Sequence, residues 1–216
     1  MAVVEREGAH LAKVVSERDD GIYDAYNKAL KLATGDIIVF LNSDDLYAHE
    51  HVVERAVAAF ADPAIEAVHA DMVYVRQDNT RQITRYWKSH TCTPSRLWRG
   101  LHPAHPTLFL RRSVYDKVGD FDRSYRIASD VEFMNRVLYR YGVRDRHVQD
   151  IWIRMREGGA TGGNVSSIKR QNVEVRRGQV VNGIRCPSAI YWGQKFLDRG
   201  LQRLAAPFVH LPRTPY

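Results

Sequence analysis

The spacing of apolar residues predicts a chain in which strands and helices alternate. Residues 11–17 (LAKVVSE) have the composition of a short strand, and apolar residues at helical spacing over 21–35 predict a helix that ends at Gly35. The run IIVFL, residues 37–41, is continuous and of strand length, which is typical of a parallel strand covered on both faces. These segments together predict a strand–helix–strand unit.

The pattern beyond residue 41 predicts further elements of both kinds. An irregular segment with three prolines, 88–106, interrupts them, and a connection of this length is more often a functional loop than filler. The pattern therefore predicts an α/β fold with a single mixed sheet flanked by helices. Helices are expected over 49–63, 113–119 and 130–141, and strands over 65–75, 81–87, 107–112 and 148–155.

The last quarter of the chain has a different character. A glycine-rich stretch over 157–167, which contains Gly158, Gly159, Gly162 and Gly163, is either a loop that closes over a ligand or a linker. The segments 166–181 and 194–208 have apolar faces with basic neighbours. Such helices fit either contact with anionic lipid or ordinary packing on the domain, and we favour packing. We predict a catalytic-type domain over 1–160 and a C-terminal helical extension over 161–216.

Composition limits the partners. The 216 residues suffice for one domain, and 32 basic against 25 acidic side chains give a net charge of +7. This charge suits a nucleoside diphosphate, an anionic membrane surface or a nucleic acid. Nucleic acid is disfavoured, although aromatic and basic residues interleave in RYWK, because acidic residues are spread through the chain and no nucleic-acid motif appears. Without a long apolar run or a signal-peptide pattern, we expect a cytoplasmic protein.

An acidic turn, Asn42-Ser43-Asp44-Asp45, follows the apolar run 37–41. Open α/β sheets bind ligands outside the carboxyl ends of their strands, so this is a favourable position for chemistry. Hard oxygen ligands of this kind suit Mg²⁺ or Mn²⁺. The alternative is that Asp44 or Asp45 only caps the next helix.

A second acidic motif, Ser129-Asp130-Val131-Glu132, opens the helix expected over 130–141. Ser-x-x-Glu is a capping box, which explains Ser129 and Glu132 without any function. The capping box does not explain Asp130. This residue lies in the first turn of the helix, where the helix dipole favours an ionised carboxylate, and it could act as a general base.

Four further residues are weaker candidates. Asp20 lies in an ordinary turn, and Asn27 and Lys28 are equally compatible with a solvated helix face. His105 could contact a phosphate or be a half-buried structural histidine.

The motifs in combination are more specific. SERDDGIYDAYNKALKLATGDIIVFLNSDDLY, followed by HPTLFLRRSVYDKVGDFDRSYRIASDVEFMNRV, resembles the family 2 glycosyltransferases with the GT-A fold, and is most similar to the branch that builds bacterial exopolysaccharide and other surface glycans. The resemblance covers residues from about Val14 to Gly159. It implies that Asn42 to Asp45 match the Asp-x-Asp metal motif of the family. Asp44 is then the best metal ligand, Asp45 the reserve, and Asn42 a contact to the donor sugar or its ribose.

The same resemblance assigns roles to the other candidates. Asp130 becomes the catalytic base with Glu132 as a candidate helper. Asp20, Asn27 and Lys28 become candidate contacts to the nucleotide or its phosphates, and His105 is grouped with them.

The function implied by the resemblance is inverting transfer of a sugar from a nucleoside-diphosphate sugar, with UDP as the expected nucleotide, to a hydroxyl of a glycan or lipid-linked acceptor. The reaction belongs to surface polysaccharide synthesis at the inner face of the plasma membrane, with Mn²⁺ or Mg²⁺ as cofactor. Family members normally begin with a strand–helix–strand unit that this sequence lacks. Either the reading frame is truncated or misassigned, or a partner chain supplies the unit. The alternative function is a non-catalytic remnant that acts as a binding module.

Overall fold

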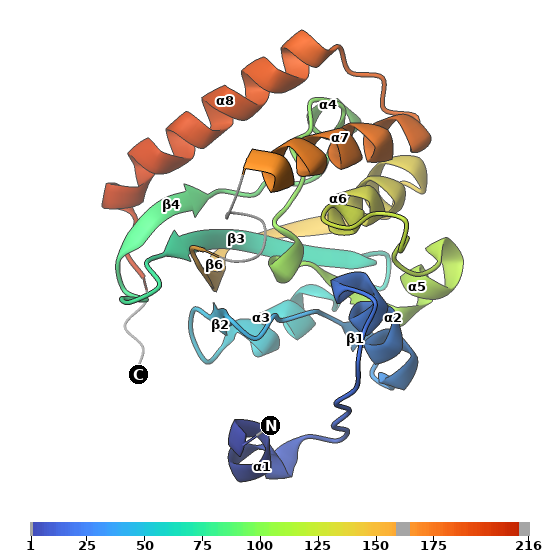
Figure 1. Ribbon diagram of the computed structural model, residues 1–216, viewed down its shortest axis with the longest axis vertical. Helices are drawn as coiled ribbons and strands as arrows, with labels where there is room; N and C mark the ends of the chain where they lie inside the picture. The colour runs from blue at the N-terminus through green and yellow to red at the C-terminus, as the bar shows by residue number, and fades with distance from the viewer. Residues whose placement is uncertain (1, 159–164, 212–216) are drawn as a thin grey trace.

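The computed structural model describes residues 2–158 and 165–211, and its centre is one mixed sheet (Figure 1). The strands run in the order β1-β5-β3-β6-β2, and β4 pairs with β3. This arrangement confirms the predicted α/β class. The strands are β1 (Ile37–Ile38), β2 (Asp45–Tyr47), β3 (Ala67–Val75), β4 (Ile83–Trp87), β5 (Phe109–Arg111) and β6 (Asp145–Arg156).

Strand β3 organises the sheet. Its first residues pair antiparallel with β5, its last residues pair antiparallel with β4, and its other edge runs parallel to β6. Eight of its nine residues are buried, as in a strand covered on both faces, and they include His69 and Asp71, whose side chains are hydrogen-bonded. Strand β2 adds to the far edge of β6, where Asp45 pairs with Met155.

Helices cover both faces of the sheet, with α3 on one side and α6, α7 and α8 on the other (Figure 1). A π-helical stretch, η3 (Asn135–Arg140), continues α6. The helices are α1 (Ala2–Glu7), α2 (Ile22–Leu32), α3 (Val52–Ala59), α4 (Pro94–Trp98), α5 (Arg112–Val118), α6 (Ser129–Met134), α7 (Val165–Val181) and α8 (Ser188–Ala205), with short turns η1 (Gly8–His10), η2 (His105–Thr107) and η4 (Ala206–Phe208).

Strand alternation divides the apolar side chains between two cores. Ala67 and Leu110 face the core that contains α2, α5, α6 and α7, whereas Val68 and Phe109 face the core beneath α3. Residues 37–40 also alternate between the two cores, so the apolar run that precedes the acidic turn is covered on both faces as predicted. Because residues 37–40 are packed on both faces of the sheet, the position at which the acidic turn begins is fixed.

Two predictions about the first strands are wrong. Residues 11–17 form no strand, because they are exposed and lie beside no partner; Val14 and Val15 are about half exposed. Only Ile37 and Ile38 of the apolar run form a ladder, and within the described residues it is antiparallel to β5 at the end of the sheet. The segment 88–106 contains the short helix α4, and Gly159, Gly162 and Gly163 lie outside the described residues.

Candidate active site

Helix α2 places two tyrosines at the site. Gly21, whose φ of 93° suits glycine, precedes the helix and lets the chain turn into it. The ring of Tyr26 stacks on Phe40 with 4.5 Å between ring centroids and lies 5.9 Å from His105. The Tyr26 hydroxyl donates a hydrogen bond to Oδ1 of Asn42. The helix therefore packs directly against the acidic turn.

The acidic turn holds one carboxylate inside the protein and one outside. Asp45 is only 4% exposed and accepts a hydrogen bond of 2.9 Å from Nδ2 of Asn42. Its other oxygen, Oδ1, is buried without a hydrogen-bond partner. Burial raises the pKa of Asp45 to about 6, despite the opposing effect of Asn42. The neighbouring Asp44 is exposed, and its backbone carbonyl accepts from Arg156 at 3.0 Å.

This geometry fits a divalent cation. An unpartnered buried carboxylate oxygen is costly, and a cation bound there would compensate it. Asp44 and Asp45 offer the one or two carboxylates that Mg²⁺ and Mn²⁺ take while they keep water and phosphate oxygens as further ligands. Asn42 is committed to Tyr26 and Asp45, so it orients the turn.

Asp130 lies close to the same tyrosines. Its Oδ1 is 3.0 Å from the hydroxyl of Tyr23, which also lies 2.7 Å from the carbonyl of Ile127. Burial, then Asp130, then Asp45 raise the pKa of Tyr26. The rings of Tyr23 and Tyr26 lie 5.9 Å apart between centroids, and Tyr26 donates a hydrogen bond to the acidic turn, so the fold brings together two motifs that are 85 residues apart in the chain.

The loop before Asp130 is held by a residue that the sequence analysis did not identify. Glu174 of α7 accepts hydrogen bonds from the backbone N–H groups of Arg126, Ile127 and Ala128 at 3.1, 2.8 and 3.0 Å. The predicted capping box is wrong, because Oγ of Ser129 is buried without a partner. A carboxylate distant in sequence fixes the start of α6 instead.

Glu132 does not join Asp130. Its carboxylate is buried in an ion pair with Arg136 at 3.0 Å and accepts from Nδ2 of Asn182 at 3.1 Å. It thus faces α7, and its interactions are structural. The helper role implied by the family resemblance is not supported, since residues two apart on a helix point to different sides.

Two of the candidate donor contacts are occupied by exposed ion pairs. Asp20 lies 3.2 Å from both Arg123 and Arg126, and Arg126 is the main cause of its lowered pKa. The ammonium group of Lys28 is surrounded by acidic groups, which raise its pKa. Its partners are Glu17, Asp19 and Asp24. Neither residue is brought to the acidic turn by these contacts.

Asn27 and His105 are both buried, with different surroundings. The Asn27 side chain donates to the carbonyl of Phe121 at 2.9 Å and accepts from its N–H at 3.0 Å, so it joins α2 to a distant loop. His105 packs near the rings of Tyr26 and Phe40, and burial lowers its pKa, which favours the neutral imidazole. His105 therefore lies at the site, whereas Asn27 contributes to it only by holding helix α2 in place.

A row of aromatic and basic residues on β3 and β4 extends the site. The Arg85 guanidinium lies over the ring of Tyr74, 3.7 Å from its centroid, and over that of Trp87 at 5.4 Å. Burial raises the pKa of Tyr74, against the lowering effect of Arg85. Tyr74 pairs with Met155 of β6, which pairs on its other edge with Asp45. His102 lies 5.8 Å from Trp87. The only signal in the sequence was the alternation in RYWK, which we had considered for nucleic acid.

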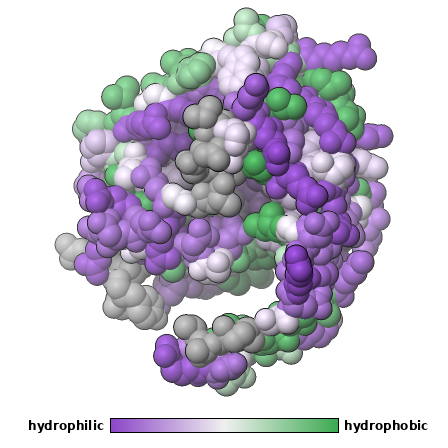
Figure 2. Space-filling view, viewed as in Figure 1, coloured by the Kyte–Doolittle hydropathy of each residue, from purple (hydrophilic) through white to green (hydrophobic). Residues whose placement is uncertain are grey.

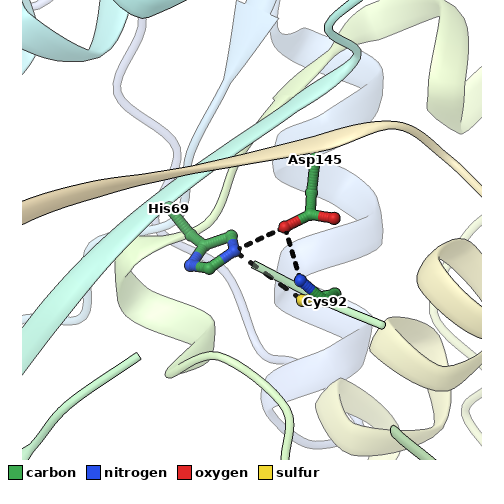
Figure 3. Close-up of side chains that lie close together, drawn as sticks. All are labelled: His69, Cys92 and Asp145. Atoms are coloured by element: carbon green, nitrogen blue, oxygen red, sulfur yellow. Dashed lines mark hydrogen bonds and ion pairs between the residues drawn. The ribbon is translucent and has the colours of Figure 1, made fainter. Parts of the chain in front are cut away.

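A second group of side chains, His69, Cys92 and Asp145, has the atoms of a metal site (Figure 3). All three offer ligand atoms within 4.8 Å of one another. However, Oδ2 of Asp145 already accepts from Nε2 of His69 and from the N–H of Cys92, each at 2.9 Å, and burial raises the pKa of the thiol. Asp145 begins β6, and the acidic turn pairs with its other end, at Met155. The paired stretch of β3 between these two positions, Ala67 to Tyr74, is roughly 23 Å long at about 3.3 Å per residue. The group is a hydrogen-bonded junction separate from the site.

The protein has a GT-A-like α/β fold. Its acidic turn and Asp130, which are far apart in the sequence, lie at the same site. The family model for glycosyl transferase family 2 matches residues 4–119, more than half of the sequence. The chain belongs to this family.

Curated relatives have the same character. The chain is 31% identical over 117 residues to the PGL/p-HBAD biosynthesis glycosyltransferase of Mycobacterium tuberculosis, which covers 54% of this chain and 43% of that protein. It is 30% identical over 129 residues to an uncharacterized glycosyltransferase of the same organism, with coverages of 56% and 45%. The chain thus spans less than half the length of these relatives.

Solved structures share the fold at low sequence identity. S. aureus TarS 1–349 in complex with UDP-GlcNAc has a TM-score of 0.62 at 20% identity, over 93% of this chain and 59% of that one. The mannosyltransferase PcManGT from Pyrobaculum calidifontis, in complex with GDP-Man and Mn²⁺, has a TM-score of 0.56 at 18% identity, over 98% and 63%.

Proposed function

We propose that this chain carries the catalytic site of an inverting glycosyltransferase, which moves a sugar from a nucleoside-diphosphate sugar to the hydroxyl of a glycan or lipid-linked acceptor. The observation that supports this most, in a chain of this family, is that neighbouring tyrosines link Asp130 to the acidic turn. Asp130 contacts the hydroxyl of Tyr23, and the hydroxyl of Tyr26 donates to Asn42, which in turn donates to Asp45. UDP is the nucleotide to test first. The acceptor class would place the reaction in surface polysaccharide synthesis, on the cytoplasmic side of the membrane.

Asp130 would act as the general base. It would accept the proton of the acceptor hydroxyl while that oxygen forms a bond to the anomeric carbon from the face opposite the diphosphate. The bond from the anomeric carbon to the diphosphate oxygen would break in the same step, and its electron pair would leave with the nucleotide. The configuration inverts because the displacement is in line. Tyr23 would keep the Asp130 carboxylate oriented through the 3.0 Å contact.

Asp44 and Asp45 would hold the cation, with Mn²⁺ or Mg²⁺ as candidates. When bound, the cation supplies positive charge that stabilises the leaving diphosphate. Asn42 and Tyr26 would fix the turn through their hydrogen bonds. His105, packed near Tyr26, is the remaining candidate that lies beside the acidic turn and would contact the donor.

Calorimetric titration of UDP, with and without Mn²⁺, tests the proposal. We expect metal-dependent binding that is lost in Asp44→Ala and in Asp45→Asn. Asp116→Ala is the matched control, since Asp116 is an exposed aspartate of α5 with no contact to the acidic turn.

Absence of binding under every condition, with an intact circular dichroism spectrum, would argue against the proposal and for a non-catalytic binding module. A gain of UDP binding on addition of a partner that carries a strand–helix–strand unit would instead support the hypothesis that another chain completes the nucleotide site.

A further inference from the structure

Helix α8 presents its apolar side to solvent. Its outward residues follow one another at intervals of seven, four, three and four, which is the spacing of one helical face. They are between 44% and 81% exposed. We call these residues the apolar stripe: Ile190, Leu197, Leu201, Leu204 and, just beyond the helix, Phe208.

The opposite side of α8, which faces the domain, is the polar one. Gln202 is buried and donates to Asp198 at 2.7 Å, and Lys195 donates to Asn172 of α7 at 2.7 Å. The only large apolar residue of the helix that is fully buried is Tyr191. Helix α8 therefore packs on the domain, against β4, as we expected, but most of its apolar residues face away from that contact. Figure 2 shows hydrophobic residues along the upper left edge, where α8 runs in Figure 1.

Such a stripe is different from scattered surface leucines, which need no explanation. Four of its residues follow one another at successive turns, from Leu197 to Phe208, with Ile190 two turns before them. Covering them with an apolar surface would stabilise the helix. No helix within residues 2–158 and 165–211 is long and apolar enough to cross a bilayer. An amphipathic helix of this type binds parallel to a membrane surface.

The charge around the stripe selects the kind of surface. Between residues 165 and 211, eight lysines and arginines are accompanied by two acidic residues, so most of the net charge of +7 resides in this part of the chain. Both acidic residues, Glu174 and Asp198, have hydrogen-bonded side chains. The basic residues are Lys169, Arg170, Arg176, Arg177, Arg185, Lys195, Arg199 and Arg203.

We propose that α8 lies on an anionic lipid surface, with the apolar stripe among the acyl chains and the exposed Arg199 and Arg203 at the headgroups. A second copy is the alternative occupant, which a measurement of the oligomeric state distinguishes. Lipid binding of this kind does not require the transferase activity proposed above. It would place the β4 side of the site, which contacts α8, next to the membrane.

Co-sedimentation of the full chain with vesicles tests this. Phosphatidylcholine vesicles are compared with vesicles that also contain phosphatidylglycerol. We expect the full chain to bind the anionic vesicles, and this binding to weaken as salt is added. In the double variant Leu197→Ser, Leu204→Ser the affinity should fall tenfold or more, because burial of even one leucine side chain contributes about that much to the affinity. The matched control is Val53→Ser, Val57→Ser on α3, whose side chains are 47% and 53% exposed and which should bind like the wild type.

Equal sedimentation of the wild type and the stripe variant would overturn the proposal, as would absence of wild-type binding to anionic vesicles. A wild-type dimer by light scattering that becomes monomeric in the stripe variant, without vesicle binding, would also overturn it in favour of a second copy. Manganese-dependent UDP binding should be unchanged in the stripe variant, which separates a failure of this inference from a failure of the proposed function.

Discussion

Replacing Asp45 by Asn should make the protein more stable at neutral pH. The buried carboxylate has a pKa raised to about 6, against about 4 for an ordinary aspartate. The folded protein therefore holds a proton at pH 5 that the unfolded chain has released. Stability from this group is fully present below pH 4 and is lost as the pH rises through 6, which amounts to roughly 3 kcal/mol.

Asparagine keeps the shape and removes the charge. Its side-chain oxygen can still accept the hydrogen bond from Asn42, and its amide takes the place of the unpartnered Oδ1. We expect Asp45→Asn to be about 2–3 kcal/mol more stable than the wild type at pH 8 and similar to it at pH 4, in urea titrations with EDTA present. Asp116→Asn, at an exposed position of α5, should keep the pH dependence of the wild type.

Parallel stability curves for the wild type and Asp45→Asn across this pH range would refute the reasoning, because the carboxylate would then carry no penalty of burial. Added Mn²⁺ should raise the stability of the wild type at pH 8 and leave that of the variant unchanged, since a ligand stabilises only the form that binds it.

Three other substitutions test separate parts of the site. Asp130→Asn should lower the transfer rate by about 10² to 10⁴ while calorimetry shows unchanged UDP binding, and equal loss of both would contradict its role as base. Glu174→Ala should cost about 3 kcal/mol in urea unfolding because three backbone N–H groups lose their acceptor, and a change under about 0.5 kcal/mol would exclude that role. Glu132→Gln should lower stability by about 2 kcal/mol, because Arg136 loses its charged partner, while the rate constant of the folded enzyme stays the same; a rate loss like that of Asp130→Asn would make Glu132 catalytic after all.

The sequence was informative where a local pattern decides the structure. The helix over 22–32, the hairpin of β3 and β4 and the helix that begins at Ser129 follow from periodicity. The apolar run indicated correctly that both faces would be covered over residues 37–40, whereas Leu41 is 42% exposed. Its pairing did not follow, because strand partners are set by tertiary contacts, and residues 11–17 have strand composition but no neighbour to pair with.

At the site, too, the features that could not be predicted from the sequence depend on tertiary contacts. Asp44, Asp45 and Asp130 were proposed from motifs, and the structure links Asp130 to the acidic turn through Tyr23 and Tyr26. Glu174 was not found, since nothing local distinguishes a glutamate on α7 that reaches a loop 46 to 48 residues earlier. Likewise, the amphipathic pattern of α8 gives the angle between its faces but leaves open which face meets the domain.

The most direct measurement is nucleoside-diphosphate release from a panel of nucleotide sugars in the presence of Mn²⁺ and a lipid-linked saccharide extract, with the wild type and Asp130→Asn compared at equal concentration. The account predicts release that requires the extract and falls at least a hundredfold in the variant. Release by the wild type no greater than by Asp130→Asn, with donor binding demonstrated for both proteins, would contradict it.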